Sequence, residues 1–308
     1  MRHSGQRNLT LASLGAIACQ PSPPPAEPAE PPFQHVADLV AGPVAFDPLG
    51  QRLVHAAGDP IRVLGFDGSL QTQWNLGTGV RDLQFAPDGS LWVLNGQGLV
   101  RAVDGTPVCT SSESSEAEQI LGVSPSGEAV LGVLQGMETG VWGTSLTVAA
   151  DCTLQRGELR QLPPTAIAWT EAGTWIGTSV NIGGGPTRFA PPSIGTPFGA
   201  LTLFADQEAT QRVTDLIIAE NVLALSDTGA WELWTLDGSR RLAAGVGGQH
   251  AVRLPGQSVA AVGTSLVNLV DGSVTPDALP APAVAISADG SLWVLGEDTQ
   301  GLWRSQAR

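Results

Sequence analysis

A seven-residue segment occurs twice in this chain, and weaker copies of it fall between the two. Residues 88–94 and 289–295 both read DGSLWVL, 201 residues apart. The copies share a turn followed by an apolar strand, and the turn residue recurs at intervals of 34 to 48 residues. These turn residues are Gly50, Gly89, Gly127, Gly173, Asn221, Gly256 and Gly290. A period near 40 with one strand–turn–strand signal in each unit is typical of β-propeller blades and not of helical repeats.

A second turn occurs later in most units. It reads Asp67-Gly68-Ser69, Asp104-Gly105-Thr106, Asp151-Cys152-Thr153, Asp237-Gly238-Ser239 and Asp271-Gly272-Ser273. Asp-Gly between apolar runs predicts a tight hairpin, because a type I′ turn needs positive φ at both central residues. Each unit therefore contains two hairpins, or four strands. Residues 91–94 are apolar on both faces of their strand, which favours a blade packed between two others.

The sequence thus predicts an all-β, seven-bladed β-propeller of four-stranded antiparallel blades over residues 34–308. The last unit supplies three strands, at residues 283–287, 292–296 and 301–305. We expect residues 34–41 to provide its fourth strand, because this leaves no unpaired edge where the ring closes. The alternative is that residues 34–41 form a loop and the ring closes by packing alone.

The N-terminal region has a different composition. Arg2 and Arg7 precede a ten-residue apolar run, residues 9–18, which is too short to span a bilayer and ends at Cys19. Residues 16–19 (AIAC) resemble the lipobox of bacterial lipoproteins. This resemblance implies a signal peptide at residues 1–18, a lipid on Cys19 and, from Gln20, an outer-membrane location facing the periplasm or the cell surface. A secretory signal peptide with an unmodified Cys19 is the alternative.

Residues 20–32 (QPSPPPAEPAEPP) favour an extended tether, so we assign residues 19–33 to a lipid-bearing linker. Two further cysteines, Cys109 and Cys152, remain in the chain. In an oxidising compartment an even number favours pairing, but a disulfide and two buried unreactive thiols both stay open.

Charge and composition exclude some functions. The chain has 29 acidic and 15 basic residues and a net charge of −14, which does not suit nucleic acid. It has no Lys and no Tyr, which excludes Schiff-base lysines and tyrosine acid–base chemistry. We therefore expect no nucleic-acid partner and no cofactor, and we expect a monomer.

The apolar–Pro–Asp–Gly–apolar pattern, as at residues 85–94, is similar to the broad bacterial propeller class with NHL-type and WD40-like repeats, over nearly all of residues 34–308. The resemblance implies an architecture and leaves the activity open. The favoured function is an envelope-anchored binding or scaffold module for an envelope protein or a small polar ligand.

We expect binding on the face that carries the longer loops and the links between blades, because the tight turns of the other face offer little to a partner. Residues 183–199 make the longest loop there; the alternative is that its side chains fold back to cap the channel. The candidates are Arg81, Asp82, Glu118, Glu138, Arg188, Phe189, Ile194, Phe198, Asp215 and His250. Their acidic majority favours a basic or polar partner.

An enzyme is the second class of function. Asn95, Asn181, Asp227 and Glu297 follow the second strand of four units and have the oxygen donors that bind hard cations. Six-bladed lactonases of the gluconolactonase type hold a metal at the channel mouth with such residues, and this similarity implies a metal-dependent lactonase- or lyase-like alternative. The sequence contains no HExxH, GxSxG or Walker motif. We therefore favour a binding module.

Overall fold

The computed structural model describes residues 33–39, 42–47, 49–50, 52–137, 140–157, 164–171, 173–178, 193–196, 199–204, 212–254, 256–286, 291–295 and 301–305. Residues 1–32, which include Cys19 and nearly all of the expected linker, lie outside this part. Within the described part, no helix has the length and apolar character needed to cross a membrane.

Hydrogen bonding arranges the described strands in seven four-stranded antiparallel sheets, here called blades. Blade 1 is β2 (Val44–Phe46), β3 (Arg52–His55), β4 (Ile61–Gly65) and β5 (Leu70–Trp74); blade 2 is β6 (Asp82–Phe85), β7 (Leu91–Asn95), β8 (Gly98–Val103) and β9 (Thr106–Ser111). Blade 3 is β10 (Gln119–Val123), β11 (Ala129–Met137), β12 (Gly140–Val148) and β13 (Leu154–Arg156); blade 4 is β14 (Pro164–Thr170), β15 (Gly173–Thr178), β16 (Ser193–Thr196) and β17 (Gly199–Thr202).

Blade 5 is β18 (Val213–Ile218), β19 (Asn221–Ser226), β20 (Ala230–Thr235) and β21 (Arg241–Val246); blade 6 is β22 (Ala251–Arg253), β23 (Val259–Val262), β24 (Ser265–Asn268) and β25 (Val274–Thr275). Blade 7 is β26 (Ala283–Ile286), β27 (Leu292–Leu295), β28 (Gly301–Ser305) and β1 (Phe33–Asp38). A short 3-10 helix, η1 (Ser112–Glu116), links blades 2 and 3.

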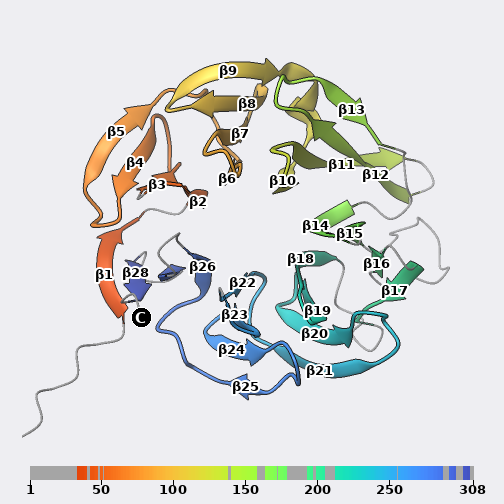
Figure 1. The fold of residues 1–308 in the computed structure, drawn as a ribbon. Coiled ribbons are helices and arrows are strands. Elements are labelled where there is room, and N and C mark those ends of the chain that lie inside the picture. Colours follow the sequence, from red (N-terminus) through yellow and green to blue (C-terminus); the bar gives the residue numbers. More distant parts are fainter. Residues whose placement is uncertain are drawn as a thin grey trace, which may run out of the picture. The chain divides into compact units, whose positions relative to one another are not determined.

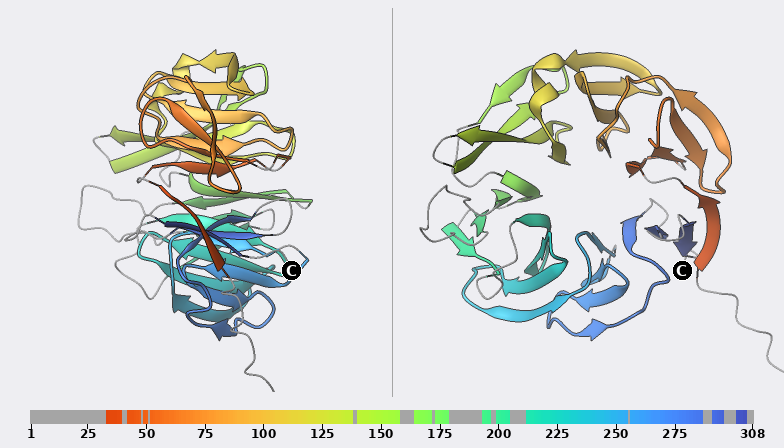
Figure 2. Two further views of the ribbon diagram at one scale, coloured as in Figure 1. Left: turned by 90° about the vertical axis from the view of Figure 1, so that its left-hand side faces the viewer. Right: turned by 180° about the vertical axis from the view of Figure 1, so that it is seen from behind.

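The blades follow one another around a ring. The first strand of each blade contacts the first strand of the next, from β2 through β6, β10, β14, β18 and β22 to β26, and β26 in turn contacts β2. Figure 1 shows these first strands nearest the middle and the last strands at the rim, and Figure 2 shows the same order from behind.

Blade 7 combines the two ends of the described chain. β1 pairs antiparallel with β28, from Phe33 opposite Ser305 to Asp38 opposite Gly301. The prediction of a strand at residues 34–41 therefore needs a correction in its bounds, because the strand begins at Phe33 and ends at Asp38. Leu39 follows the strand and is buried among apolar residues of blades 7 and 1, so it packs after the pairing ends.

Apolar side chains are buried between neighbouring blades. Trp92, from one DGSLWVL copy, is fully buried against Ile120 and Leu131 of blade 3. Trp293, the matching residue of the other copy, is fully buried among blade 1 residues, and its ring lies 5.1 Å from that of Phe46. The repeated tryptophan therefore packs each of these blades onto the next one.

The turns between the third and fourth strands also join neighbouring blades. In blade 1 the Asp67 carboxylate accepts hydrogen bonds from the backbone N–H and hydroxyl of Ser69, which lower its pKa. Gly68 has a φ of +81°, and an added Cβ would clash with the backbone of β1 in blade 7. Gly105 of blade 2 has a φ of +77° and lies against Trp74 of blade 1 in the same way. Glycine is required for both the turn and this close contact.

Blade 3 has a cysteine where these turns have glycine. Cys152 adopts a φ of +63° and forms a disulfide with Cys109 of β9, in blade 2, with their Cα atoms 5.8 Å apart. Neither cysteine is fully buried. The covalent bond therefore joins blades 2 and 3 at the site where glycine provides close contact in other blades.

We predict that the double variant Cys109→Ala/Cys152→Gly loses roughly 4 kcal/mol of unfolding free energy, because the disulfide closes a segment with a sequence separation of 43 residues. Cys109→Ala/Cys152→Ala should be about 1 kcal/mol less stable again, since alanine is strained at positive φ. Urea denaturation of the three proteins measures both differences. Equal midpoints for the wild type in oxidised and reduced form would contradict the stabilising role.

Candidate functional site

The ring has two faces. The turns between the first and second and between the third and fourth strands of each blade lie on one, here called the turn face. The other, here called the link face, carries the loops between the second and third strands and the links from blade to blade.

Two arginines on the turn face hold adjacent blades together. Arg52 of blade 1 donates to Asp47 of its own blade and to Asp104 of blade 2, both at 2.8 Å. Arg101 of blade 2 donates to Asp88 of its own blade at 2.5 Å and to the carbonyl of Ala150, in blade 3, at 2.9 Å. These charged groups are therefore engaged in contacts between blades.

On the link face, side chains near the start of the first strands bond to the backbone of the next blade. These bonds run from Gln84 to Ile120 O, from Gln119 to Thr165 O, from Thr165 to Val213 O and from Thr214 to Gln249 O, at 2.6 to 3.0 Å. Thr165 and Thr214 are the extra residues of β-bulges in β14 and β18. A bulge redirects the side chain of the extra residue, and here it places each hydroxyl within reach of the next blade.

Asp82 and Asp215, two predicted partner-binding residues, belong to this set of contacts. Asp82 accepts the N–H groups of Leu83 and, in blade 3, Ile120, both at 2.8 Å. Asp215 accepts the N–H of Leu216 at 2.8 Å and that of Ala251, in blade 6, at 2.9 Å. Burial raises the pKa of both carboxyl groups. Each of their oxygens accepts a backbone N–H of the protein itself, so both carboxylates have a structural role between blades, and their contact with a partner stays a prediction.

Arg81 has a similar structural role. Its guanidinium donates to the carbonyls of Asn95 and Ala117, both at 2.7 Å, and of Ser115 at 3.1 Å. It therefore ties the link after β9 to blade 2. Glu118, at the end of the same link, is exposed and remains accessible on the link face.

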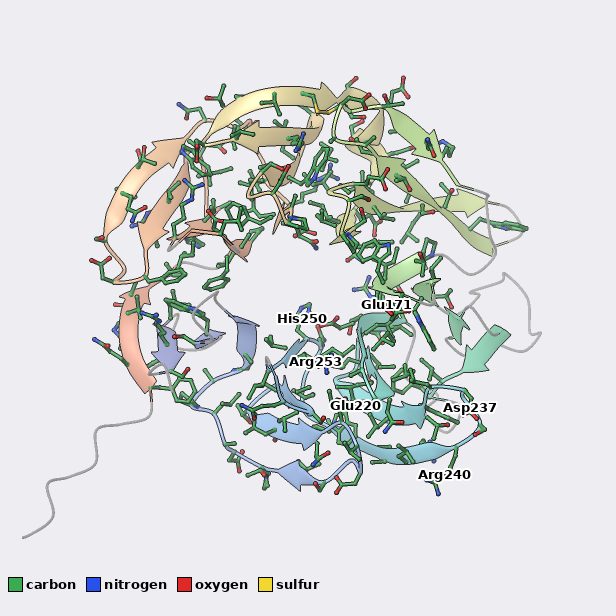
Figure 3. The ribbon with its side chains drawn as sticks, viewed as in Figure 1. Glu171, Glu220, Asp237, Arg240, His250 and Arg253 are labelled. Carbon is green, nitrogen blue, oxygen red and sulfur yellow. A yellow bond between two sulfur atoms is a disulfide. The ribbon has the colours of Figure 1, made fainter. Side chains whose placement is uncertain are left out.

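A small pocket of about 140 Å³, here called the mouth pocket, opens where the first strands of four consecutive blades begin. Its lining residues are Gln119, Thr165, Arg212, Val213, Thr214, Gln249 and His250. His250, which was predicted to lie on this face, projects from the start of β22 toward the middle of the ring (Figure 3). Among the described residues, no carboxylate lies within ion-pair distance of Arg212, and no group hydrogen-bonds to the His250 ring. The mouth pocket therefore presents two side chains of basic character without acceptors in this part of the chain.

A larger hollow of about 480 Å³ lies where β1 meets the turn between β4 and β5. Two of its charged residues have structural roles. Arg304 lies over the rings of Phe66 and Trp293, with its guanidinium carbon 5.2 and 5.5 Å from their centres. Asp67 holds the adjacent turn. This hollow belongs to the contact between blades 7 and 1.

The predicted metal ligands are not brought together in the described part. Asn95 is buried; its amide donates to Leu76 O at 2.8 Å and its Oδ1 accepts the N–H of Gln97. Asp227 accepts the backbone N–H of Arg212. Asn181 and Glu297 lie outside the described residues. Among the residues that the structure describes, no group of three or more His, Cys, Asp or Glu side chains could hold a metal ion.

The predicted loop at residues 183–199 also needs correcting. Residues 193–196 form β16, the third strand of blade 4, and β17 begins at Gly199. Ile194 therefore lies in a strand, opposite Leu201. Serine, glycine and threonine surround Ile194, which gives little of the apolar alternation that identifies a strand. The other expected loop residues, Arg188, Phe189 and Phe198, and Glu138 lie outside the described part.

Sequence reasoning missed most of the mouth pocket. Arg212, Gln119, Thr165, Thr214 and Gln249 were not among its candidates. Their common position in the repeat could have identified them, since each lies near the start of a first strand when the repeats are aligned on their turns. The bulges at Thr165 and Thr214 have no clear sequence mark.

Comparison with known proteins identifies the fold. No protein-family model and no curated protein matches this chain. Among solved structures, a chain in the crystal structure of a mitotic checkpoint complex superposes with a TM-score of 0.60 at 14% identity, covering 98% of this chain and 99% of that one. This chain has a β-propeller fold.

Two further structures agree. The β-propeller domain of Myceliophteria thermophila Cps50 (Swd1) gives a TM-score of 0.57 at 11% identity, and the computationally designed Ika8 protein gives 0.56 at 13%. Each match covers 89% of this chain and 100% of the other. At these identities the likeness extends to the fold alone.

We predict that Arg81→Ala lowers the unfolding free energy by about 2 kcal/mol, because it removes charge-assisted hydrogen bonds to three carbonyls. Arg240→Ala is the matched control; Arg240 is an exposed arginine of blade 5 whose side chain makes no described hydrogen bond, and its loss should change stability by less than about 0.5 kcal/mol. Urea denaturation compares the two. Equal losses of unfolding free energy in the two variants would contradict the structural role of Arg81.

Proposed function

We propose that this chain is an envelope-anchored binding or scaffold module whose partner docks on the link face. The observation that carries the proposal is the mouth pocket, to which blades 3, 4, 5 and 6 all contribute. A group held there contacts four blades at once. The turn face, by contrast, uses Arg52 and Arg101 to join its own blades.

A protein is the class of partner that we favour. One structure with a similar fold is a chain of a mitotic checkpoint complex, which is a multi-protein assembly. A propeller also suits this task physically, because a rigid ring presents residues from several blades in fixed positions and loses little conformational entropy on binding.

The proposed anchor is a lipid on Cys19, in the outer membrane of a bacterial envelope. Its support is in the sequence, namely the apolar run at residues 9–18, the small residues before Cys19 and the Pro-rich residues 20–32. Stable anchoring needs two or more acyl chains, since one gives marginal membrane binding.

We predict that the full chain, expressed in a bacterium, incorporates radioactive fatty acid and sediments with membranes. Cys19→Ala should lose the label and become soluble, whereas Cys109→Ala should keep the label. Label retained by Cys19→Ala would rule out the proposed anchor.

We predict that a photo-crosslinking amino acid placed at Glu118, an exposed residue of the link face, captures a protein partner in the native envelope. The control position is Gln257, an exposed residue of the turn face between β22 and β23. Crosslinks should form from position 118 and not from position 257. Capture from position 257 alone would place recognition on the opposite face.

A further inference from the structure

The charges around the mouth pocket differ from those of the chain as a whole. The net charge is −14, yet the exposed charged and titratable side chains that line the pocket are Arg212 and His250. Arg212 directly precedes β18 and His250 directly precedes β22, so the two come from adjacent blades. In the described part of the chain, neither side chain has a hydrogen-bond or ion-pair partner.

Three acidic groups lie near the pocket. The Asp227 carboxylate accepts the backbone N–H of Arg212 at 3.3 Å, and Asp215 and Asp82 lie close enough to His250 for a positive charge on it to lower their pKa. Asp215 is half-buried beside the pocket, and both of its oxygens accept backbone N–H groups, from Leu216 and Ala251. Asp82 is held in the same way by Leu83 and Ile120. Burial raises the pKa of both carboxyl groups, which disfavours their charged forms. The carboxylates of Asp82 and Asp215 are thus engaged by backbone N–H groups, whereas the side chains of Arg212 and His250 have no such partner in the described part.

The other polar groups of the pocket are fixed by the protein. The Thr165 hydroxyl donates to Val213 O at 2.6 Å and the Thr214 hydroxyl to Gln249 O at 2.7 Å. The Gln249 amide donates to Asp227 O at 2.7 Å. These bonds hold the rim in one arrangement and leave the guanidinium and the imidazole as the donors available to a ligand.

We infer that Arg212 and His250 bind a carboxylate, supplied by an acidic side chain of the partner protein that enters the mouth pocket. This inference rests on the proposed function and specifies its chemistry. It also differs from the expectation of a basic partner at this point of the surface, because two of the acidic residues on which that expectation depended, Asp82 and Asp215, accept backbone N–H groups of the next blade.

Size and charge both favour a side-chain carboxylate. At about 140 Å³ the pocket is well below the roughly 300–1,000 Å³ of clefts that enclose whole small-molecule ligands, so it fits the end of a side chain. The planar guanidinium can donate two parallel hydrogen bonds to a carboxylate. Phosphate has the same acceptor chemistry, but as a dianion it experiences about twice the repulsion from a protein of charge −14.

The test uses N-acetyl-glutamate N-methylamide, which mimics a glutamyl side chain in a peptide. Its binding to the purified full chain is followed through the NMR signal of the His250 imidazole, which is assignable because the chain has four histidines. We expect saturable binding in the millimolar range. The corresponding glutamine compound should bind at least tenfold more weakly.

Arg212→Gln should weaken binding of the glutamate compound at least tenfold without changing the melting temperature. Arg240→Gln is the matched control, since it removes the same charge from the same blade at a distance from His250 (Figure 3). It should bind like the wild type. Wild-type affinity in Arg212→Gln, or equal binding of the glutamine compound, would overturn the inference, as would tighter binding of inorganic phosphate.

The same variant separates this inference from the proposed function. With the crosslinker at position 118, Arg212→Gln should reduce partner capture at least tenfold and Arg240→Gln should not. Full capture by Arg212→Gln would leave the binding module in place and overturn the role of the carboxylate. No capture by any form, with tight discrimination between the glutamate and glutamine compounds, would support the carboxylate site and count against a protein partner.

Discussion

Strands that are apolar on both faces impose the main constraint on this molecule, because each blade then needs a neighbour on both sides. Trp92 and Trp293 illustrate how strongly this packing stabilises the fold, since burying one large aromatic side chain contributes roughly 4–6 kcal/mol. An open row of blades would leave an apolar face exposed at each end. The contact between β26 and β2, with Trp293 packed against Phe46, removes both exposed faces at once.

The joints between blades combine this apolar packing with polar contacts at different depths. Near the rim, Gly68 and Gly105 allow close contact with the preceding blade, and Cys152 replaces that contact by a covalent bond. Near the middle, Asp82 and Asp215 connect first strands through backbone N–H groups. Some polar residues that a surface position would assign to binding therefore stabilise the contacts between blades instead. For this reason the candidate site is smaller than the link face that contains it.

Sequence reasoning succeeds here where neighbouring residues determine the structure. The turns at Gly68 and Gly105 and the strand that pairs with β28 could be located, because turn chemistry and apolar runs are local signals. The role of Asp215 could not, since its partner Ala251 lies 36 residues further along the chain. The charge of the mouth pocket could not be predicted either. A sequence shows how many acidic residues there are, but not which of their oxygens accept hydrogen bonds from the protein's own backbone. Strand β16 was missed for a different reason, as its composition resembles that of a loop.

The pairing of β1 with β28 has a consequence for the order in which the molecule is made. Residues 33–38 are the first described part of the chain to be synthesised and residues 301–305 the last. Blades 1 to 6 consist of consecutive hairpins that can form from local contacts as they appear, but blade 7 has to wait for the end of the chain. Until then β1 has no partner within its blade, and the unclosed ring exposes strand edges that favour aggregation. Closure is thus a late step of high contact order. Until it occurs, the nascent protein depends most on protection from aggregation.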